Sequence, residues 1–327
     1  MIQQPRYVAC CDIGGTKARL GLVDRQGNIH ASDRYLLSTP LEPEQLVTEL
    51  VSRFRGLARR RSIPWDALIG VGCSAAFMAD VERGVVFSAP NIFGPRQDIP
   101  FTAIFEDAVG LPVYLEMDAN AAALGEAWLG AGRGIDDFVY VVVGTGIGAG
   151  ILVNGQVCHG WRGTAGEFGH ITLVPEGPLC NCGRYGCLEA LAAGPAIALR
   201  AQGALRQNRP TQMRALAEDG EVSTALVFEA ARCGDTVARQ IVDETVRFLG
   251  TGLTTLIHLL NPEVIALGGG VITGGRDLLL EPLRREVVRR CGSWVDVEGM
   301  RVVVAMLDED AGLLGVARQV WQLDENP

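Results

Sequence analysis

The residues with the clearest chemistry lie between Glu167 and Glu189, in the stretch EFGHITLVPEGPLCNCGRYGCLE. It brings together one imidazole and three thiols at a spacing typical of a metal site: His170, Cys180, Cys182 and Cys187. Four such ligands would close a tetrahedron around Zn²⁺ and leave no coordination position for an activated water. The alternative is that these cysteines are unrelated core residues, since a free thiol packs as a small apolar group. Gly183 and Gly186, which permit tight turns between the thiols, favour a structural zinc site.

Three glycine-rich segments could bind phosphate. Residues 12–17 read DIGGTK, residues 144–150 read GTGIGAG, and Gly268–Gly270 follow an apolar stretch. Glycine lets backbone N–H groups approach an anion, threonine adds a hydroxyl donor, and a carboxylate such as Asp12 can hold Mg²⁺ through its waters. The third segment would lie at the carboxyl end of a strand, where α/β sheets bind ligands. Each segment taken alone could also be an ordinary turn.

A strand pattern that occurs twice would position the first two of these segments. Residues 7–11 and 138–143 are apolar strands that run into the Gly/Thr segments, and each is followed by two further short strands. Both copies predict a β-meander, with Asn154-Gly155 as a hairpin turn in the second. Strands and helices then alternate, which indicates an α/β fold. The meander strands are expected at 18–23, from 28, at 151–153 and at 156–157; the later strands at 68–73, 113–115, 264–267 and 302–306; and the helices at 44–57, 119–129, 225–232, 237–260 and 311–321.

Asp118 follows the expected strand 113–115 and precedes an alanine-rich helix, whose small side chains would leave room beside a cleft. An aspartate at such a junction commonly caps the helix. It could also act as a general base that accepts a hydroxyl proton during in-line phosphoryl transfer. The two roles are compatible, and spacing does not choose between them.

Composition narrows the class of protein. A chain of 327 residues with 48% hydrophobic residues is long enough for two lobes. The formal charge of −9 argues against a nucleic-acid partner, and the basic run 53–61 is best explained as a solvated helix face. No apolar stretch is long enough to span a bilayer, because glycines interrupt residues 138–153. We therefore expect a cytoplasmic protein whose cysteines are reduced or bound to metal.

Taken together, these motifs resemble the ROK family of sugar kinases and repressors, within the ATPase superfamily of actin, hexokinase and the heat-shock chaperones. The resemblance runs from end to end and includes DIGGTK, DANAAALGE at 118–126, VGTGIGAGILVNG at 143–155, GxxGEFGH at 163–170 and CNCGRYGCLE at 180–189. It implies an α/β, ribonuclease H-like fold of two duplicated lobes around a cleft, which closes to exclude water. It also implies phosphorylation of a hexose by ATP, with Mg²⁺, structural Zn²⁺ and a homodimer.

The resemblance also implies roles for individual residues. Asp118 would be the catalytic base. The sugar or its metal-supported loop would be contacted by Glu167, His170 and Glu189, with Asn91 and Met117 also at the sugar. The residues around ATP would be Asp12, Gly14, Gly15, Thr16, Lys17, Gly144, Thr145, Gly146 and Gly269.

The sequence departs from the family pattern where hexose hydroxyls are read. Residues 73–78 replace a Pro-Gly-Pro turn, Met117 replaces an asparagine, and Pro95 replaces an aromatic residue near the retained Asn91. Glucose, phosphorylated at its 6-hydroxyl, is the expected substrate. N-acetylglucosamine or N-acetylmannosamine is the alternative, since apolar replacements suit a substrate that lacks or masks a hydroxyl.

A non-catalytic sugar sensor is the second class of function that we consider. Repressors of the family carry a winged helix-turn-helix ahead of the kinase-like body, and only eleven residues precede Asp12 here, so we expect a kinase. The expected domains are a small lobe at 1–116, on which a C-terminal helix at 311–327 packs, and a large lobe at 117–310 with the zinc knuckle.

Overall fold

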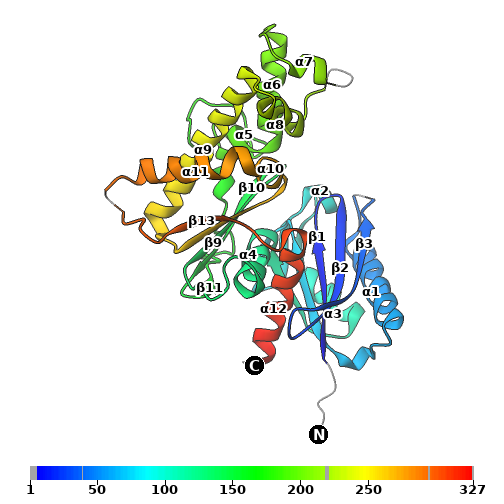
Figure 1. Ribbon diagram of the computed structural model, residues 1–327. Coiled ribbons are helices and arrows are strands. Elements are labelled where there is room, and N and C mark those ends of the chain that lie inside the picture. The colour runs from blue at the N-terminus through cyan, green and yellow to red at the C-terminus, as the bar shows by residue number, and fades with distance from the viewer. Residues whose placement is uncertain (1–5, 39, 218–220, 294, 326–327) are drawn as a thin grey trace. The chain divides into compact units, whose positions relative to one another are not determined.

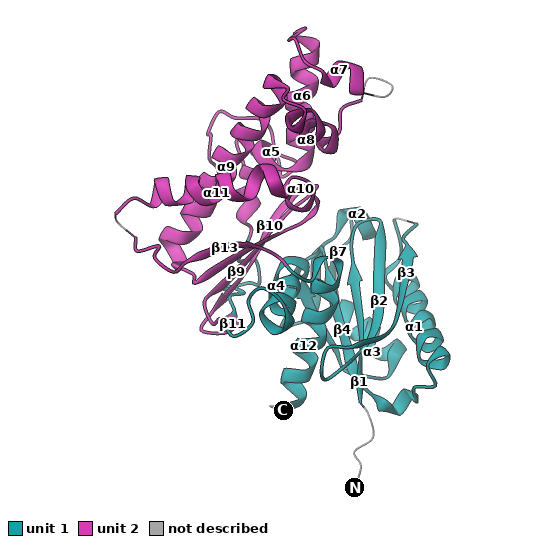
Figure 2. Ribbon diagram, in the orientation of Figure 1, with its two compact units in different colours: residues 1–134, 157–166, 306–327 teal, residues 135–156, 167–305 magenta. Residues whose placement is uncertain are grey.

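The structure, a computed structural model, describes residues 6–38, 40–217, 221–293 and 295–325 (Figure 1). The chain forms two compact units, coloured separately in Figure 2. Unit 1 comprises residues 1–134, 157–166 and 306–327, and unit 2 comprises residues 135–156 and 167–305. The chain therefore passes between the units four times.

The core of unit 1 is a five-stranded sheet with the order β3-β2-β1-β4-β8. Its first three strands form the predicted antiparallel meander, and β4 and β8 run parallel to β1. Each strand that the sequence predicted here is present, extended by one to several residues. The bounds are β1 Tyr7–Ile13, β2 Lys17–Asp24, β3 Ile29–Leu36, β4 Leu68–Ala75 and β8 Val113–Met117.

Helices cover both faces of this sheet. Ala9 and Cys11 of β1 belong to a core that includes Phe54 of α1 (Pro43–Arg60) and Phe105 of α3 (Phe101–Val109). The alternate residues Val8 and Cys10 pack with α4 (Asp118–Leu129) and α12 (Ala311–Glu325). This alternation follows from the two-residue period of a strand, and it explains why β1 is almost wholly apolar.

The small residues of α4 allow close packing on α12. A Cβ atom on Gly125 would lie 2.2 Å from the carbonyl oxygen of Ala311, and one on Gly315 would lie 1.6 Å from that of Ala121. The backbones of α4 and α12 thus approach too closely for larger side chains. The C-terminal helix was predicted on unit 1, and α12 belongs to that unit; residues 326–327 lie outside the described residues.

A three-stranded antiparallel sheet in unit 1 was not predicted. Its strands are only three or four residues long, which is too short for a clear two-residue period. Three phenylalanines in tilted and edge-to-face contact, Phe77, Phe93 and Phe101, connect it to the main core. The bounds are β5 Met78–Asp80, β6 Val85–Ser88 and β7 Gln97–Ile99, with the short helices η1 Trp65–Ala67 and α2 Pro90–Phe93.

The sheet of unit 2 repeats the arrangement of unit 1 with the order β11-β10-β9-β12-β13. β9 and β10 are antiparallel, and β12 runs parallel to both β9 and β13. The glycine-rich segment 144–150 is less of a loop than the sequence suggested, because β10 already begins at Ile147 and contains Gly148 and Gly150. The bounds are β9 Phe138–Val143, β10 Ile147–Val153, β11 Gln156–Val157, β12 Val264–Gly268 and β13 Arg301–Val304.

Helices complete unit 2. Two of the predicted helices, α8 and α9, begin where a side chain caps them: Ser223 accepts a hydrogen bond from Leu226 N, and Asp235 accepts one from Ala238 N. The helices are η2 Phe168–His170, α5 Leu188–Ala192, α6 Gly194–Arg206, α7 Met213–Leu216, α8 Thr224–Arg232, α9 Thr236–Leu260, α10 Gly270–Gly274 and α11 Arg276–Cys291; η4 Asp308–Asp310 lies in unit 1.

The whole of α4 belongs to unit 1, whereas the predicted lobe boundary precedes this helix, at residue 116. The packing of α4 on α12 accounts for this difference. The lobe boundaries at 116 and 310 stay a prediction. Among the described residues, no helix is long and apolar enough to cross a membrane.

Candidate functional site

Three strand ends in unit 1 bring acidic and hydroxyl groups side by side. Asp12 near the end of β1 pairs in register with Ser74 of β4, which pairs with Glu116 of β8. The Ser74 hydroxyl donates to Asp12 Oδ1 at 2.9 Å. Burial raises the pKa of Asp12, and the hydrogen bond from Ser74 opposes that rise. A Cβ on Gly312 would lie 3.2 Å from the Asp12 carboxyl carbon, so the first turn of α12 lies against this group.

The Gly/Thr turn after β1 is held by a backbone hydrogen bond from Gly14 N to Lys17 O of 2.9 Å. Asn91 lies beside the turn, because a Cβ on Gly15 would be 3.7 Å from Asn91 Cβ. The exposed Lys17 amine is 3.4 Å from Glu309 Oε1. The fold thus places Asn91 next to the turn. The Lys17 amine pairs with a carboxylate of the same unit.

Asp118 is the first residue of α4, and the N-cap position belongs to Met117. The capping role considered for Asp118 is therefore not the one observed. Asp118 is exposed, and its Oδ1 accepts a hydrogen bond from Ala119 N at 2.7 Å. A carboxylate at the positive end of a helix is stabilised as the anion, which is the form a general base needs.

The second Gly/Thr turn, in unit 2, is buttressed by Glu189. Gly144 N donates to Gly146 O at 2.9 Å, and Ile147 N donates to Glu189 Oε2 at 3.0 Å. A Cβ on Gly146 would lie 2.6 Å from that same carboxylate oxygen, so a larger residue there would displace the Glu189 side chain. Gly269 has a φ of 89°, and a Cβ there would lie 2.5 Å from Val143 O. The two glycine clusters of unit 2 therefore lie next to each other.

A cavity of about 580 Å³ opens beside this turn, a size that suits a nucleoside. Its lining is largely apolar and includes Thr145, Pro195, Thr224, Phe228 and Val271. The Thr224 hydroxyl donates to Gly194 O at 2.8 Å, and Gly194 N donates to Gly144 O at 2.8 Å, which links the cavity wall to the turn. Sequence reasoning found Thr145 and missed the other four. No pattern in the sequence indicates that residues 195–228 lie near the Gly144–Gly146 turn, because only the tertiary fold brings them together.

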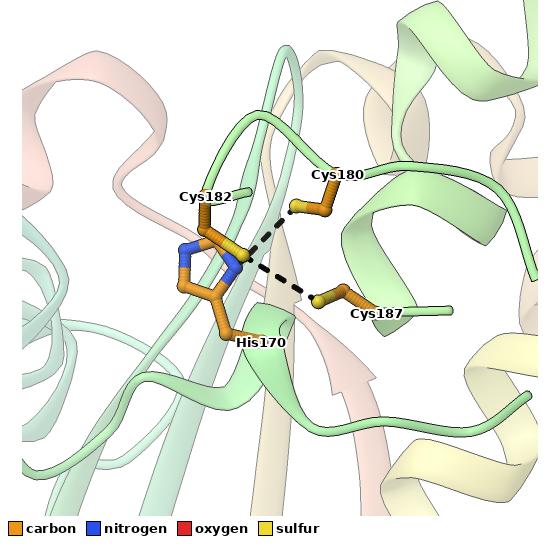
Figure 3. Close-up of side chains that lie close together, drawn as sticks. All are labelled: His170, Cys180, Cys182 and Cys187. Carbon is orange, nitrogen blue, oxygen red and sulfur yellow. Dashed lines mark hydrogen bonds between the residues drawn. The ribbon is translucent and has the colours of Figure 1, made fainter. Parts of the chain in front are cut away.

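The four predicted metal ligands converge, as Figure 3 shows. Their ligand atoms all lie within 4.8 Å of one another, with 3.6 Å between the Sγ atoms of Cys182 and Cys187 and 3.7 Å between Cys180 Sγ and His170 Nδ1. Tetrahedral ligands around zinc, with Zn–S bonds of about 2.3 Å, are about 3.8 Å apart. The donor set and its spacing therefore fit Zn²⁺.

The surroundings of the cluster act in opposite directions on two of its thiols. A backbone hydrogen bond from Arg184 lowers the pKa of Cys182 to about 6, whereas burial raises the pKa of Cys180 to about 12. A bound cation would favour the deprotonated form of both. His170 presents Nδ1 to the thiols, and its Nε2 lies 3.8 Å from Glu167 Oε2. Glu167 is exposed, so the structure places it beside the cluster and not within it.

Comparison with known proteins agrees with this architecture. The sequence profile of the ROK family matches residues 8–322. The chain is 36% identical over 318 residues to a glucokinase of Halalkalibacterium halodurans, covering 95% of this chain and 93% of that one. Among solved structures it is similar to a ROK hexokinase of Thermus thermophilus, with a TM-score of 0.80, 34% identity, and 98% of this chain and 100% of that one covered. A ROK family glucokinase of Streptomyces griseus, in complex with glucose and AMPPNP, gives a TM-score of 0.79 at 36% identity, covering 97% and 99%.

The duplicated α/β units, the paired Gly/Thr turns and the His/Cys cluster thus define the class of protein that the sequence suggested: a sugar kinase of the actin-like ATPase fold. The chain belongs to the ROK family.

Proposed function

We propose that this protein is an ATP-dependent kinase that transfers the γ-phosphoryl group of ATP to the 6-hydroxyl of glucose. The observation that carries the proposal is Asp118, an exposed carboxylate at the positive end of α4, in a chain that is similar over its length to glucokinases. A hexose hydroxyl is a poor nucleophile until a base accepts its proton, and Asp118 can do so.

The turns of the two units would divide the binding of ATP. The cavity of unit 2 suits the adenosine, and the adjacent Gly144–Gly146 turn offers backbone donors to the phosphates. The Gly14–Thr16 turn and Asp12 of unit 1 are suited to the terminal phosphate and the Mg²⁺ that accompanies ATP. Lys17 would have to leave Glu309 to contact a phosphate, and an exposed pair of this kind is worth at most about 1 kcal/mol.

The sugar would be read by groups from both units. Asn91 beside the first turn, Glu167 beside the His/Cys cluster, and the Nε2 atom of the cluster residue His170 would supply donors and acceptors for ring hydroxyls. The second oxygen of Glu189, Oε1, does not bond Ile147 N and lies 3.7 Å from Cys180 Sγ; it would be a further acceptor. Met117 supplies no comparable hydrogen bond, and this is the feature that leaves an N-acetylated hexosamine as the alternative substrate.

His170, Cys180, Cys182 and Cys187 would hold Zn²⁺ as a structural ion, because all four positions of the tetrahedron come from the protein. The ion would fix the segment from Glu167 to Glu189, and with it the carboxylates at both ends. The phosphoryl transfer itself does not require this zinc ion.

A kinase assay with a sugar panel tests this function. ADP release is measured with glucose, N-acetylglucosamine, N-acetylmannosamine, mannose and fructose, each with Mg·ATP, and the product is located by ³¹P NMR. Glucose 6-phosphate as the product with the highest kcat/KM supports the proposal. Glucose binding by calorimetry without turnover of any sugar would identify a sensor instead.

The homodimer and the cytoplasmic location stay predictions. Light scattering after gel filtration tests the homodimer.

A further inference from the structure

Two buried glutamates lie near the two ends of α4, and the mechanism above uses neither. Glu116, at the end of β8, is 1% exposed, and Glu126, in the last turns of α4, is 0% exposed. A buried carboxylate is costly unless hydrogen bonds satisfy it, so its partners indicate what it is for.

The partners of Glu116 lie around the first turn of α4. Its Oε1 accepts hydrogen bonds from Met117 N at 2.9 Å and from the buried Asn120 amide at 3.1 Å. Its Oε2 accepts one from His159 Nε2 at 2.8 Å. Gln319 Nε2 is a longer contact, at 3.5 Å. Asp118 lies between Met117 and Asn120, so this carboxylate fixes the turn that carries the proposed base.

The partners of Glu126 lie at the other end of α4. Its Oε1 accepts hydrogen bonds from Met306 N at 2.8 Å and Leu307 N at 2.7 Å, and its Oε2 accepts one from Ala131 N at 2.7 Å. All three donors are backbone groups, which cannot rotate away as a side chain can. The carboxylate therefore holds two separate stretches of main chain against one helix end.

These partners share a location in the chain. The chain changes units after residues 134, 156, 166 and 305. Ala131 lies three residues before the first change, and Met306 is the first residue after the last. His159 lies in the ten-residue segment 157–166, between the second and third changes. Each of the three segments of unit 1 that adjoin these changes is thus bonded to Glu116 or to Glu126.

We propose that Glu116 and Glu126 are positioning residues that tie α4, and thereby Asp118, to the segments connecting the two units. Neither touches a substrate. Their effect is on where Asp118 lies when both units hold their ligands, and a displacement of about 1 Å at a reacting group can cost about 100-fold in rate. This inference rests on the proposed kinase function for its kinetic consequence, and the anchoring of the segments can be measured without any activity.

His159 offers the cleanest test, because its side chain is about one-third exposed and can be changed without opening the core. His159→Leu removes the donor, whereas His159→Gln keeps an N–H near the position of Nε2. His30 is a matched control, since its Nε2 lies 2.7 Å from Asp24 Oδ2 in the same unit but holds no connecting segment. We expect His159→Leu to lower kcat at least about fivefold with both KM values within twofold of wild type. His159→Gln and His30→Leu should stay within twofold in kcat.

Trypsin cleavage measures the anchoring of residues 157–166 without requiring kinase activity. Arg162 is the only Lys or Arg in residues 157–166, so cleavage there reports on release of this segment. His159→Leu should accelerate cleavage after Arg162 at least about fivefold, as followed by intact mass. Wild-type protein without kinase activity would overturn the proposed function, and this arm would still decide the anchoring.

Glu126→Gln is the second arm and applies if His159→Leu does not fold. The amide oxygen can still accept from Met306 and Leu307, but the new NH₂ group faces the N–H of Ala131, so one connecting segment is released. We expect kcat to fall with little change in KM. Unchanged kcat and unchanged cleavage after Arg162 in His159→Leu would overturn the proposal, as would equal losses in His159→Leu and His30→Leu. Equal losses in His159→Leu and His159→Gln would also overturn it, because the hydrogen bond would then not be what matters.

Discussion

The turn after β1 in unit 1 and the turn after β9 in unit 2 are copies of one design with different carboxylates. In each, three residues of glycine and threonine join the first two strands of a meander, and two parallel strands follow in the same sheet order. Unit 1 places Asp12 in the strand itself, bonded to Ser74. Unit 2 has Val142 at the equivalent position two residues before its turn, and receives its carboxylate, Glu189, from α5.

This difference indicates that the two copies of the fold have different roles. The Asp12 carboxylate lies among strand ends, and Asp118 directly follows β8 of the same sheet as the first residue of α4, which suits metal-assisted transfer of a phosphoryl group. One oxygen of the Glu189 carboxylate accepts from Ile147 N beside the Gly144–Gly146 turn, and the other lies 3.7 Å from Cys180 Sγ, which connects the turn to the His/Cys cluster. We therefore expect changes in unit 1 to act on turnover and changes in unit 2 to act on binding.

The largest effect should come from Asp118→Asn in unit 1. The amide cannot accept the hydroxyl proton, so kcat should fall at least about 100-fold while ATP binding and the melting temperature stay close to wild type. Steady-state kinetics and differential scanning fluorimetry measure both. Asp107→Asn, an exposed aspartate on α3 of the same unit, is the control. Activity of Asp118→Asn within a few-fold of wild type would remove Asp118 from the mechanism.

Cys182→Ser tests the role of unit 2. Loss of one thiolate from a closed site should lower zinc affinity at least about tenfold, because even outer partners of metal ligands contribute 10- to 100-fold. The Glu167–Glu189 segment should loosen, so KM for the sugar should rise more than KM for ATP. Zinc is measured by mass spectrometry of protein purified without chelators. Cys233→Ser, an exposed thiol outside the cluster, is the control. Wild-type protein without stoichiometric zinc would contradict the metal assignment.

The sequence predicted the duplicated meander and the metal cluster because both depend on neighbours in the chain. Apolar runs such as 138–143 became strands at the expected residues, and four ligands within 18 positions can meet without long-range information. The cavity wall of Thr224 and Phe228 and the hydrogen bond of Ser74 to Asp12 depend on strand and helix packing, which no local pattern encodes. Ser74 had one usable signal, since it directly follows the predicted strand 68–73.

The Met117→Asn substitution tests whether the sugar binds next to the proposed base, Asp118, in unit 1. A hydroxyl left unpaired against a thioether costs about 1–3 kcal/mol, and an amide would supply the missing hydrogen bond. We expect kcat/KM for glucose to improve about tenfold relative to the best wild-type substrate, the low end of that cost. The same five sugars are compared for both proteins. An unchanged ranking would show that Met117 fills space and does not set specificity.

The smallest expected effect is a pH dependence of stability that belongs to unit 1. The hydrogen bond that His159 donates to Glu116 raises the pKa of His159, burial opposes the rise, and Glu82 adds a favourable charge. Because the folded pKa lies above the unfolded value of about 6.5, the stabilisation is fully present below about pH 6.5 and is lost as pH rises through the folded pKa. Its size is about 1 kcal/mol or less, since the imidazole is partly exposed. Urea unfolding of wild type and His159→Gln should therefore differ most at pH 5.5–6 and converge above about pH 8, since glutamine keeps the donor and lacks the charge. A difference that is constant with pH would mean that the charge on His159 contributes nothing, and that the neutral hydrogen bond alone anchors the segment to α4.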